Sequence, residues 1–177
     1  FDDIERWILE EKDLALSEQM EDVVFDGIVQ WLATRELAEQ SFEVRSELAQ
    51  RIAAQLDTGL SITGVGENRS TEQLTQLREN SILLMEAWLV RQAREYGLLT
   101  RAERPAYLDA QIERVTRWGV LDFVAGNPGG SALTAFPQIV QRCIDRAPAA
   151  DKGNLQQLMA DVQARMLMKW LQGATRD

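Results

Sequence analysis

Apolar residues recur every three or four positions along most of the chain, and no segment alternates apolar and polar residues convincingly. The first spacing places apolar side chains on one face of an α-helix, whereas strict alternation would indicate a β-strand. We therefore predict an all-α fold, a bundle of about seven helices. The predicted helices span residues 2–16, 17–37, 41–58, 71–96, a fifth that begins between 100 and 105, a sixth between Pro137 and Pro148, and 151–172.

The expected helix ends coincide with residues that favour caps. A serine at an N-terminus accepts a hydrogen bond from a backbone amide of the first turn, and a glycine after the last turn adopts the left-handed conformation that ends a helix. A threonine followed three residues later by a glutamate has the spacing of a capping box. The predicted boundary residues are Ser17, Ser41 and either Ser70 or Thr71 at N-termini, Gly59 and Gly97 at C-termini, and the pair Thr100 and Glu103.

The length of 177 residues is that of one ordinary domain, so we expect residues 1–177 to form a single helical domain. Glycine-rich segments near 58–70 and 126–131 predict flexible loops within it. Three helices end in a Trp-Leu pair, which suggests an array of helical hairpins as one form of the bundle. The unequal spacing of these pairs fits a chance match of common helix residues as well.

The chain contains no histidine and a single cysteine, Cys143. This excludes Ser-His-Asp and Cys-His catalytic sites, histidine-containing zinc and di-iron sites, intrachain disulfides and cysteine-ligated clusters. The acidic stripe Glu18, Asp22 and Asp26 offers oxygen ligands, but one helix does not supply a complete cation site. We therefore expect no catalytic residue, no metal site and no cofactor, with Cys143 as an inert buried side chain.

Acidic residues outnumber basic ones by 28 to 19, which gives a net charge of −9. A chain of this charge repels phosphate backbones, so nucleic acid is an unfavourable partner. No apolar run is long enough for a transmembrane helix, and the sequence begins without a signal-peptide pattern. Together with the single unpaired cysteine, these features favour a cytoplasmic protein that does not associate with membranes.

The predicted helix 17–37 carries apolar residues on two sides, whereas a surface helix normally has one apolar face. Either this helix is central and packs on both sides, or one side binds a protein partner or a second copy of the chain. The candidate partner-binding residues on that side are Phe25, Val29, Leu32, Asp22 and Asp26.

Two groups of residues are candidates for binding an anion. The glycine-containing loop near 58–70 leads into a helix N-terminus, where backbone amides can hold an anion. Several arginines follow near the other end of the same helix. They either pair with acidic residues of the chain itself or bind an anion or an acidic partner. The candidate anion-binding residues are Arg69, Ser70, Arg91, Arg94, Arg101 and Arg104.

Five tryptophans occupy apolar positions of the predicted helices, where they either pack in the core or line an aromatic pocket between helices. The last helix carries Met159, Met166 and Met168, a candidate surface for self-association into a dimer.

These features favour a non-catalytic helical protein-interaction or regulatory module, as part of a larger protein or assembly. The alternatives are a helical domain that binds a small molecule, as effector domains do, and an enzyme that uses carboxylates and arginines.

Overall fold

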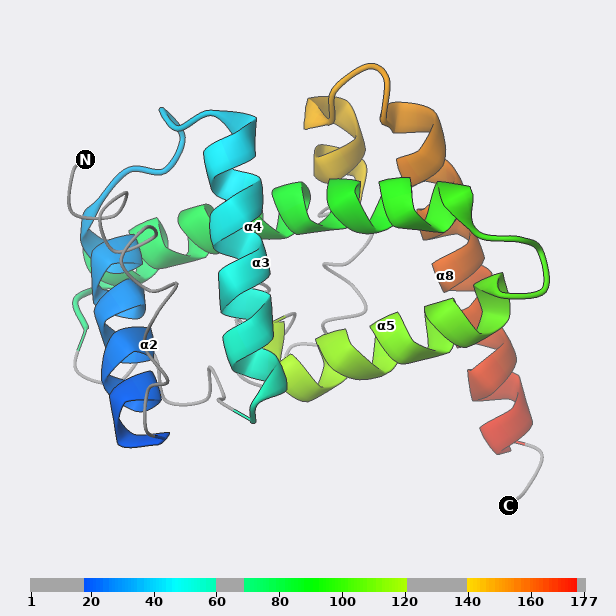
Figure 1. The fold of residues 1–177 in the computed structure, drawn as a ribbon, viewed down its shortest axis with the longest axis horizontal. Coiled ribbons are helices and arrows are strands. Elements are labelled where there is room, and N and C mark those ends of the chain that lie inside the picture. Colours follow the sequence, from blue (N-terminus) through cyan, green and yellow to red (C-terminus); the bar gives the residue numbers. More distant parts are fainter. Residues whose placement is uncertain (1–17, 60–68, 121–139, 175–177) are drawn as a thin grey trace.

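The computed structural model describes residues 18–59, 69–120 and 140–174, and the side chains of residues 26–59, 69–120 and 140–169. The described residues form helices and turns, with no β-strand among them, so the all-α prediction is confirmed. The predicted helix 2–16 and the predicted loop 126–131 lie outside these residues. The described helices are α2 (Glu18–Thr34), α3 (Phe42–Asp57), α4 (Thr71–Leu98), α5 (Arg104–Trp118), a segment at 140–146, and α8 (Lys152–Ala174) (Figure 1).

Helices α3 and α4 begin at the serines that the sequence indicates. The Ser41 hydroxyl accepts a hydrogen bond from the backbone N–H of Val44 at 3.3 Å. Ser70 and Gln73 form a reciprocal capping box, in which each side chain accepts from the backbone N–H of the other residue at 3.2 and 3.0 Å. These bonds satisfy N–H groups that a first helical turn leaves unpaired. At the end of α3, Gly59 has a φ of 105°, in agreement with its predicted role as a stop.

Gly97 does not end α4, contrary to the prediction. The helix continues through Gly97 to Leu98, and Leu99 follows in an extended conformation. The glycine instead lies against α8, where an added Cβ atom would meet side-chain atoms of Asn154 at 3.1 to 3.2 Å. The close approach of two helices, rather than a left-handed turn, therefore explains the glycine at this position.

A polar turn connects α4 to α5. The Glu103 carboxylate accepts hydrogen bonds from the Thr100 hydroxyl at 2.7 Å and from the Thr100 backbone N–H at 2.8 Å, and these bonds hold the pKa of Glu103 below its usual range. The helix itself begins only at Arg104, so the pair forms a turn ahead of α5 instead of the predicted cap. Pro105 lies in the first turn, where its missing N–H has no partner to lose.

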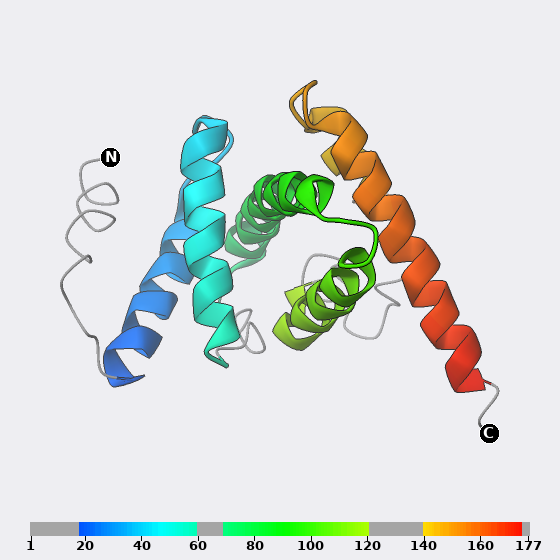
Figure 2. The same cartoon turned by 45° about the vertical axis from the view of Figure 1, so that its right-hand side comes forward.

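Helix α4 is the centre of the described fold. Its 28 residues make it about 42 Å long. It packs against α2, α3 and α8, and α5 packs in turn against α3 and α8 (Figures 1 and 2). The described helices therefore gather round one long helix, without forming a row of equivalent hairpins.

From the sequence, helix 17–37 could be a central helix that packs on both sides. In the described structure the central helix is α4. Among the described side chains of α2, Val29 and Leu32 are buried, whereas Asp26 is exposed, so this part of α2 has one buried side. By contrast, α4 buries side chains around most of its circumference, because helices cover it from several directions. Its buried residues include three polar ones, Asn80, Glu86 and Gln92.

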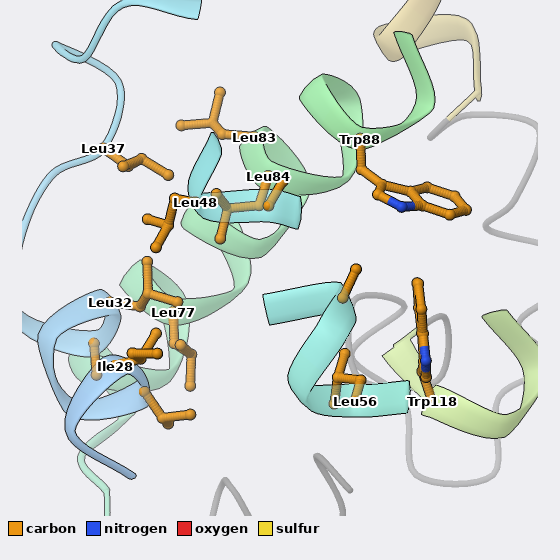
Figure 3. Packing of buried hydrophobic residues seen from close by; sticks show 14 residues of the cluster. Ile28, Leu32, Leu37, Leu48, Leu56, Leu77, Leu83, Leu84, Trp88 and Trp118 are labelled. Atoms are coloured by element: carbon orange, nitrogen blue, oxygen red, sulfur yellow. The ribbon is translucent and has the colours of Figure 1, made fainter. Parts of the chain in front are cut away.

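The buried apolar side chains form two clusters along α4. The first cluster joins α2, α3 and the N-terminal part of α4, and it includes Leu77 and Trp88 (Figure 3). The second cluster joins the C-terminal part of α4 to the segment 140–146 and to α8. The partly buried Leu89 packs against both clusters. Cys143 belongs to the second cluster and is buried, as expected from the sequence.

Candidate functional site

An apolar pocket of about 160 Å³ lies between α4 and the helices around it. Residues of α2, α3, α4, α5 and α8 line it, and none of the described lining residues is charged. A charged group in such a pocket would be desolvated without a partner, so the composition favours an apolar occupant. The polar residues in the lining are Ser81, Gln92, Gln111 and Thr116.

Most of these polar side chains already have partners outside the pocket. The hydroxyls of Ser81 and Thr116 donate to the backbone carbonyls one turn earlier, at 2.7 and 2.8 Å. The side-chain oxygen of Gln92 accepts a hydrogen bond from the Tyr107 hydroxyl at 2.8 Å. The side-chain oxygen of Gln111 accepts from Arg114 at 3.2 Å. The pocket is therefore even less polar than the residue types of its lining indicate.

Several apolar side chains of the lining are only partly buried, although they face the interior of the helical assembly. They belong to four different helices, so the space extends across the whole interface and is not a local defect. Apolar side chains in a filled core are normally covered on all sides. The partly buried lining residues are Ile52, Leu89, Ile112, Val115, Val162 and Met166.

Two tryptophans form one end of the pocket. The rings of Trp88 and Trp118 pack edge to face, with centroids 5.3 Å apart and planes inclined by 69°. The indole N–H of Trp118 donates to Asp57 Oδ1 at 3.1 Å. The indole N–H of Trp88 is buried and has no hydrogen-bond partner in the described part of the chain. In Figure 3 this nitrogen lies on the edge of the ring nearer to Trp118, with Leu56 of α3 beside the pair.

The unpartnered Trp88 N–H is the most informative atom of the pocket. Buried tryptophan N–H groups usually find a hydrogen-bond partner, and a buried donor without one carries a desolvation cost. Trp88 lines the pocket and is only 5% exposed, so bulk water does not reach its nitrogen freely. An acceptor atom that reaches hydrogen-bond distance of this nitrogen would satisfy the donor.

Helix α5 forms one wall of the pocket, and mainly polar contacts hold this helix in place. Only Leu108 and Trp118 of this helix are buried. Its ends and outer face are tied instead by hydrogen bonds and ion pairs, which connect it to three neighbouring helices. These pairs are Arg114 with Asp57 of α3 at 2.5 Å, Asp109 with Arg165 of α8 at 2.5 Å, and Tyr107 with Gln92 of α4 at 2.8 Å.

The carboxylates that hold α5 stay ionised at neutral pH. Hydrogen bonds from Arg165 and Lys169 hold the pKa of Asp109 well below its usual range. Burial raises the pKa of Asp57, but the hydrogen bond and positive charge of Arg114, with the Trp118 N–H, outweigh it and lower this pKa as well. The ties around the pocket therefore persist across the neutral pH range.

The residues predicted to bind a protein partner on helix 17–37 do not form an exposed apolar face. Val29 and Leu32 are 5% and 4% exposed, because they pack in the first core cluster against α3 and α4. Both also line the apolar pocket. Asp26 is exposed, and the side chains of Asp22 and Phe25 lie outside the described residues. Partner binding through Val29 and Leu32 would therefore require the core to open.

The residues predicted to bind an anion do not converge. Arg69 and Ser70 lie at the N-terminus of α4, whereas the arginines at its other end are most of the helix length away. The capping box uses both the Ser70 hydroxyl and its backbone N–H. Arg94 forms a bidentate pair with Asp151, with both distances 2.7 Å. Pairing within the chain, the alternative that the sequence left open, accounts for Arg94.

The other three arginines of that group have different surroundings. Arg91 pairs with Glu95 on the same helix at 3.4 Å, and Arg104 lies over the Tyr96 ring at 4.8 Å from its centroid. Arg101 is exposed in the turn before α5. Arg91 and Arg104, like Arg94, therefore have contacts within the described part of the chain.

No group of three or more acidic or cysteine side chains within the described residues is arranged to hold a metal ion. Burial raises the pKa of the Cys143 thiol to about 12, so this thiol is protonated at neutral pH and is a poor nucleophile. None of the described helices is long and apolar enough to cross a lipid bilayer.

Sequence reasoning named the tryptophans as a possible pocket lining but did not locate the pocket. The pairing of Trp88 with Trp118 depends on how α5 folds back toward α3, and no local pattern specifies that contact. Ile112 and Val115 of α5 do line the pocket, but their spacing indicates only which face of the helix turns inward.

Comparisons with models of protein families, with curated protein sequences and with solved structures find no match to this chain.

Proposed function

We propose that this chain is a non-catalytic helical domain that binds a small, mostly apolar molecule in the pocket beside α4. The observation that carries the proposal is a pocket whose described lining is uncharged and includes a buried donor, the Trp88 N–H, with no hydrogen-bond partner among the described residues. The protein-interaction module favoured by the sequence would use an exposed apolar face on helix 17–37 or on the last helix, and Val29 and Leu32, the described apolar candidates on helix 17–37, are buried. The small-molecule alternative needs an apolar space beside tryptophans, which is present.

The pocket indicates both the size and the chemistry of the ligand. Apolar cavities of roughly 150 Å³ stay dry and bind molecules of the size of benzene. The pocket, at about 160 Å³, therefore suits a molecule with one aromatic ring and a short substituent. A single acceptor on that substituent, such as a ketone or ether oxygen, would pair with the Trp88 N–H, whereas a charged group would have no partner.

Helix α5 supplies the route by which such a ligand enters. Its few buried side chains and its polar ties allow it to move away from α4 at lower cost than a helix with a fully packed face. Breaking the Arg114–Asp57 pair would loosen the wall of the pocket without removing any lining residue.

A matched pair of probes tests the proposal, namely acetophenone and α-methylstyrene. These molecules have nearly the same shape, but only acetophenone carries an acceptor oxygen. We expect both to bind saturably in ¹H–¹⁵N NMR titrations, with acetophenone tighter by roughly 2- to 13-fold, the value of one net hydrogen bond. The indole N–H signal of Trp88 should shift with acetophenone much more than with α-methylstyrene.

Two tryptophan variants complete this test. Trp88→Phe keeps an aromatic ring but removes the donor, so the preference for acetophenone should disappear while binding of α-methylstyrene persists. Trp31→Phe is the matched control, because Trp31 packs against the first core cluster but does not line the pocket. Failure of both probes to bind the folded wild-type chain, or an equal preference for acetophenone in Trp88→Phe, would overturn the proposal.

Self-association through α8 is a second candidate, and a specific observation favours it. Leu167 and Met168 are 57% and 53% exposed, which is unusual for large apolar side chains. Met159, which the sequence placed on this surface, is instead buried in the second core cluster. Size exclusion with light scattering over a concentration series tests a dimer at this end of α8, and Leu167→Glu should shift any dimer to monomer. A monomer at all concentrations removes this candidate.

A further inference from the structure

A second hollow, of about 340 Å³, lies on the side of α4 away from the apolar pocket. Leu83 and Val90 of α4 line this hollow, whereas Met85 and Gln92 line the apolar pocket. With 3.6 residues per turn, these two sets lie on roughly opposite faces of the helix. Helix α3 and the segment 140–146, drawn in gold beside α4 in Figure 1, form the other walls.

Charged side chains from three elements meet at this hollow. Arg45 of α3 and Arg146 of the segment 140–146 line it, with Glu86 of α4 between them. Arg142, one turn before Arg146, also pairs with Glu86. Three guanidinium groups thus surround one carboxylate, and the cluster keeps an excess of positive charge in a chain whose net charge is −9.

The central carboxylate is held loosely. Glu86 Oε1 lies 3.4 Å from Arg142 Nε and 3.6 Å from Arg146 Nη1, and it has no hydrogen-bond partner in the described part of the chain. By comparison, the Arg94–Asp151 pair closes to 2.7 Å. Glu86 is only 6% exposed, so solvent does not replace the missing bonds. Burial raises the pKa of Glu86 although the three arginines act to lower it.

Two of the guanidinium groups also have Nε donors that form no hydrogen bond. The Nε atoms of Arg45 and Arg142 are buried and have no hydrogen-bond partner among the described residues, although Arg142 Nε lies 3.4 Å from Glu86 Oε1 as an ion pair. Buried charged donors are nearly always paired in folded proteins, either with the protein or with a bound group. A single carboxylate cannot neutralise three arginines, and an added anion would supply the missing acceptors.

We propose that this hollow binds the carboxylate of a small organic acid, which Arg45 and Arg146 hold beside Glu86. The planar fork of a guanidinium matches the two oxygens of a carboxylate. The rest of the lining is apolar and includes Phe42, Val90 and Cys143, so it accommodates a short aliphatic chain rather than an inorganic ion alone. Glu86 keeps the arginines in place and limits the affinity, because it competes with the ligand for them.

The experiment compares sodium butyrate, sodium phosphate and sodium chloride at equal ionic strength, by ¹H–¹⁵N NMR of the wild-type chain. We expect butyrate to cause saturable shifts of the backbone amides of Val90 and Cys143, which line the hollow, and no comparable shift at Trp118 in the apolar pocket. Chloride should cause no saturable shift at these positions. Equal responses to butyrate and chloride would mean charge screening only and would overturn the proposal, as would binding of phosphate without binding of butyrate.

Two variants change the charge of the cluster in opposite directions. Arg45→Gln removes one guanidinium and should weaken butyrate binding roughly tenfold or more, the cost of a charge-assisted hydrogen bond. Glu86→Gln keeps the shape of the side chain but removes the competing charge, so butyrate should bind more tightly. A merely structural cluster would not give this pair of opposite effects.

A matched control separates local from general charge effects. Arg91→Gln removes the same charge from the exposed side of α4, where Arg91 pairs with Glu95, and it should leave butyrate binding unchanged. Variants are compared only where circular dichroism shows native helicity, and wild-type saturation by butyrate decides the proposal if a variant unfolds. Because the hollow and the apolar pocket are separate, failure of either ligand to bind leaves the other proposal intact.

Discussion

Replacing Asn80 by leucine should detach the C-terminal end of α2 from α4. The buried Asn80 side chain accepts a hydrogen bond from the Leu37 backbone N–H at 3.0 Å. Its amide nitrogen donates to the carbonyls of Leu32 and Arg35, both at 2.7 Å. One side chain therefore satisfies three backbone groups at the end of α2, where the helix no longer supplies partners.

The magnitude follows from which of these groups are buried. Leu32 and Leu37 are buried, whereas Arg35 is exposed, so water can replace the bond to the Arg35 carbonyl. Two backbone groups are then left buried without a partner, at about 1–3 kcal/mol each. The expected loss in the free energy of unfolding is about 2–6 kcal/mol, against a typical domain stability of about 5–15 kcal/mol.

Urea unfolding followed by far-ultraviolet circular dichroism measures this loss. Glu79→Leu is the control, since Glu79 is the exposed neighbour of Asn80 on α4, and its replacement should change stability by no more than about 0.5 kcal/mol. Hydrogen exchange of the Leu37 amide should accelerate in Asn80→Leu and not in the control. A loss of unfolding free energy below about 1 kcal/mol, with the Leu37 amide still protected, would refute the conclusion that Asn80 holds the end of α2 against α4.

Three further predictions concern stability. The hydrogen bond to Arg94 lowers the pKa of Asp151 in the folded chain. The pair therefore stabilises the fold fully above the unfolded pKa of about 3.9, and this contribution is lost as the pH falls through the lower folded pKa. In urea unfolding, the stability difference between wild type and Asp151→Asn should shrink from pH 7 toward pH 3. Gly59→Ala should cost about 1–2 kcal/mol in thermal unfolding, because its φ of 105° strains any side chain although no atom lies within 4 Å of the new Cβ; an unchanged melting temperature would contradict this. Ser70→Ala should cost about 1 kcal/mol by removing the N-cap of α4, and Ser70→Asp should restore most of it.

The helix ends that depend on local chemistry could be predicted from the sequence. Ser41, Ser70 and Gly59 act through residues within one turn, so their spacing alone carries the information. Gly97 is the exception, because its neighbour Asn154 is distant in the sequence and only the packing of α8 against α4 brings them together. The same glycine signal therefore indicates a turn in one place and a helix contact in the other.

The central role of α4 could not be read from its apolar pattern. Its buried Asn80 and Glu86 look like surface residues in a sequence, because their partners come from other helices. Conversely, Val29 and Leu32 look like a free second face of helix 17–37, whereas α3 and α4 cover them. Burial of polar residues by distant partners is information that periodicity does not contain.

The two core clusters on α4 have a consequence for cooperativity. Trp88 belongs to the first cluster and Val90 to the second, so the boundary between them crosses the helix within a single turn. Each half of the fold has its own apolar core, and two helices join them, since α4 contributes to both clusters and α5 supplies Trp118 to the first and Leu108 to the second. The apolar pocket reaches Leu77 in one half and Leu158 in the other, so a ligand seated there would add contacts between the two halves. Occupation of the pocket should therefore make the unfolding of the two halves more cooperative.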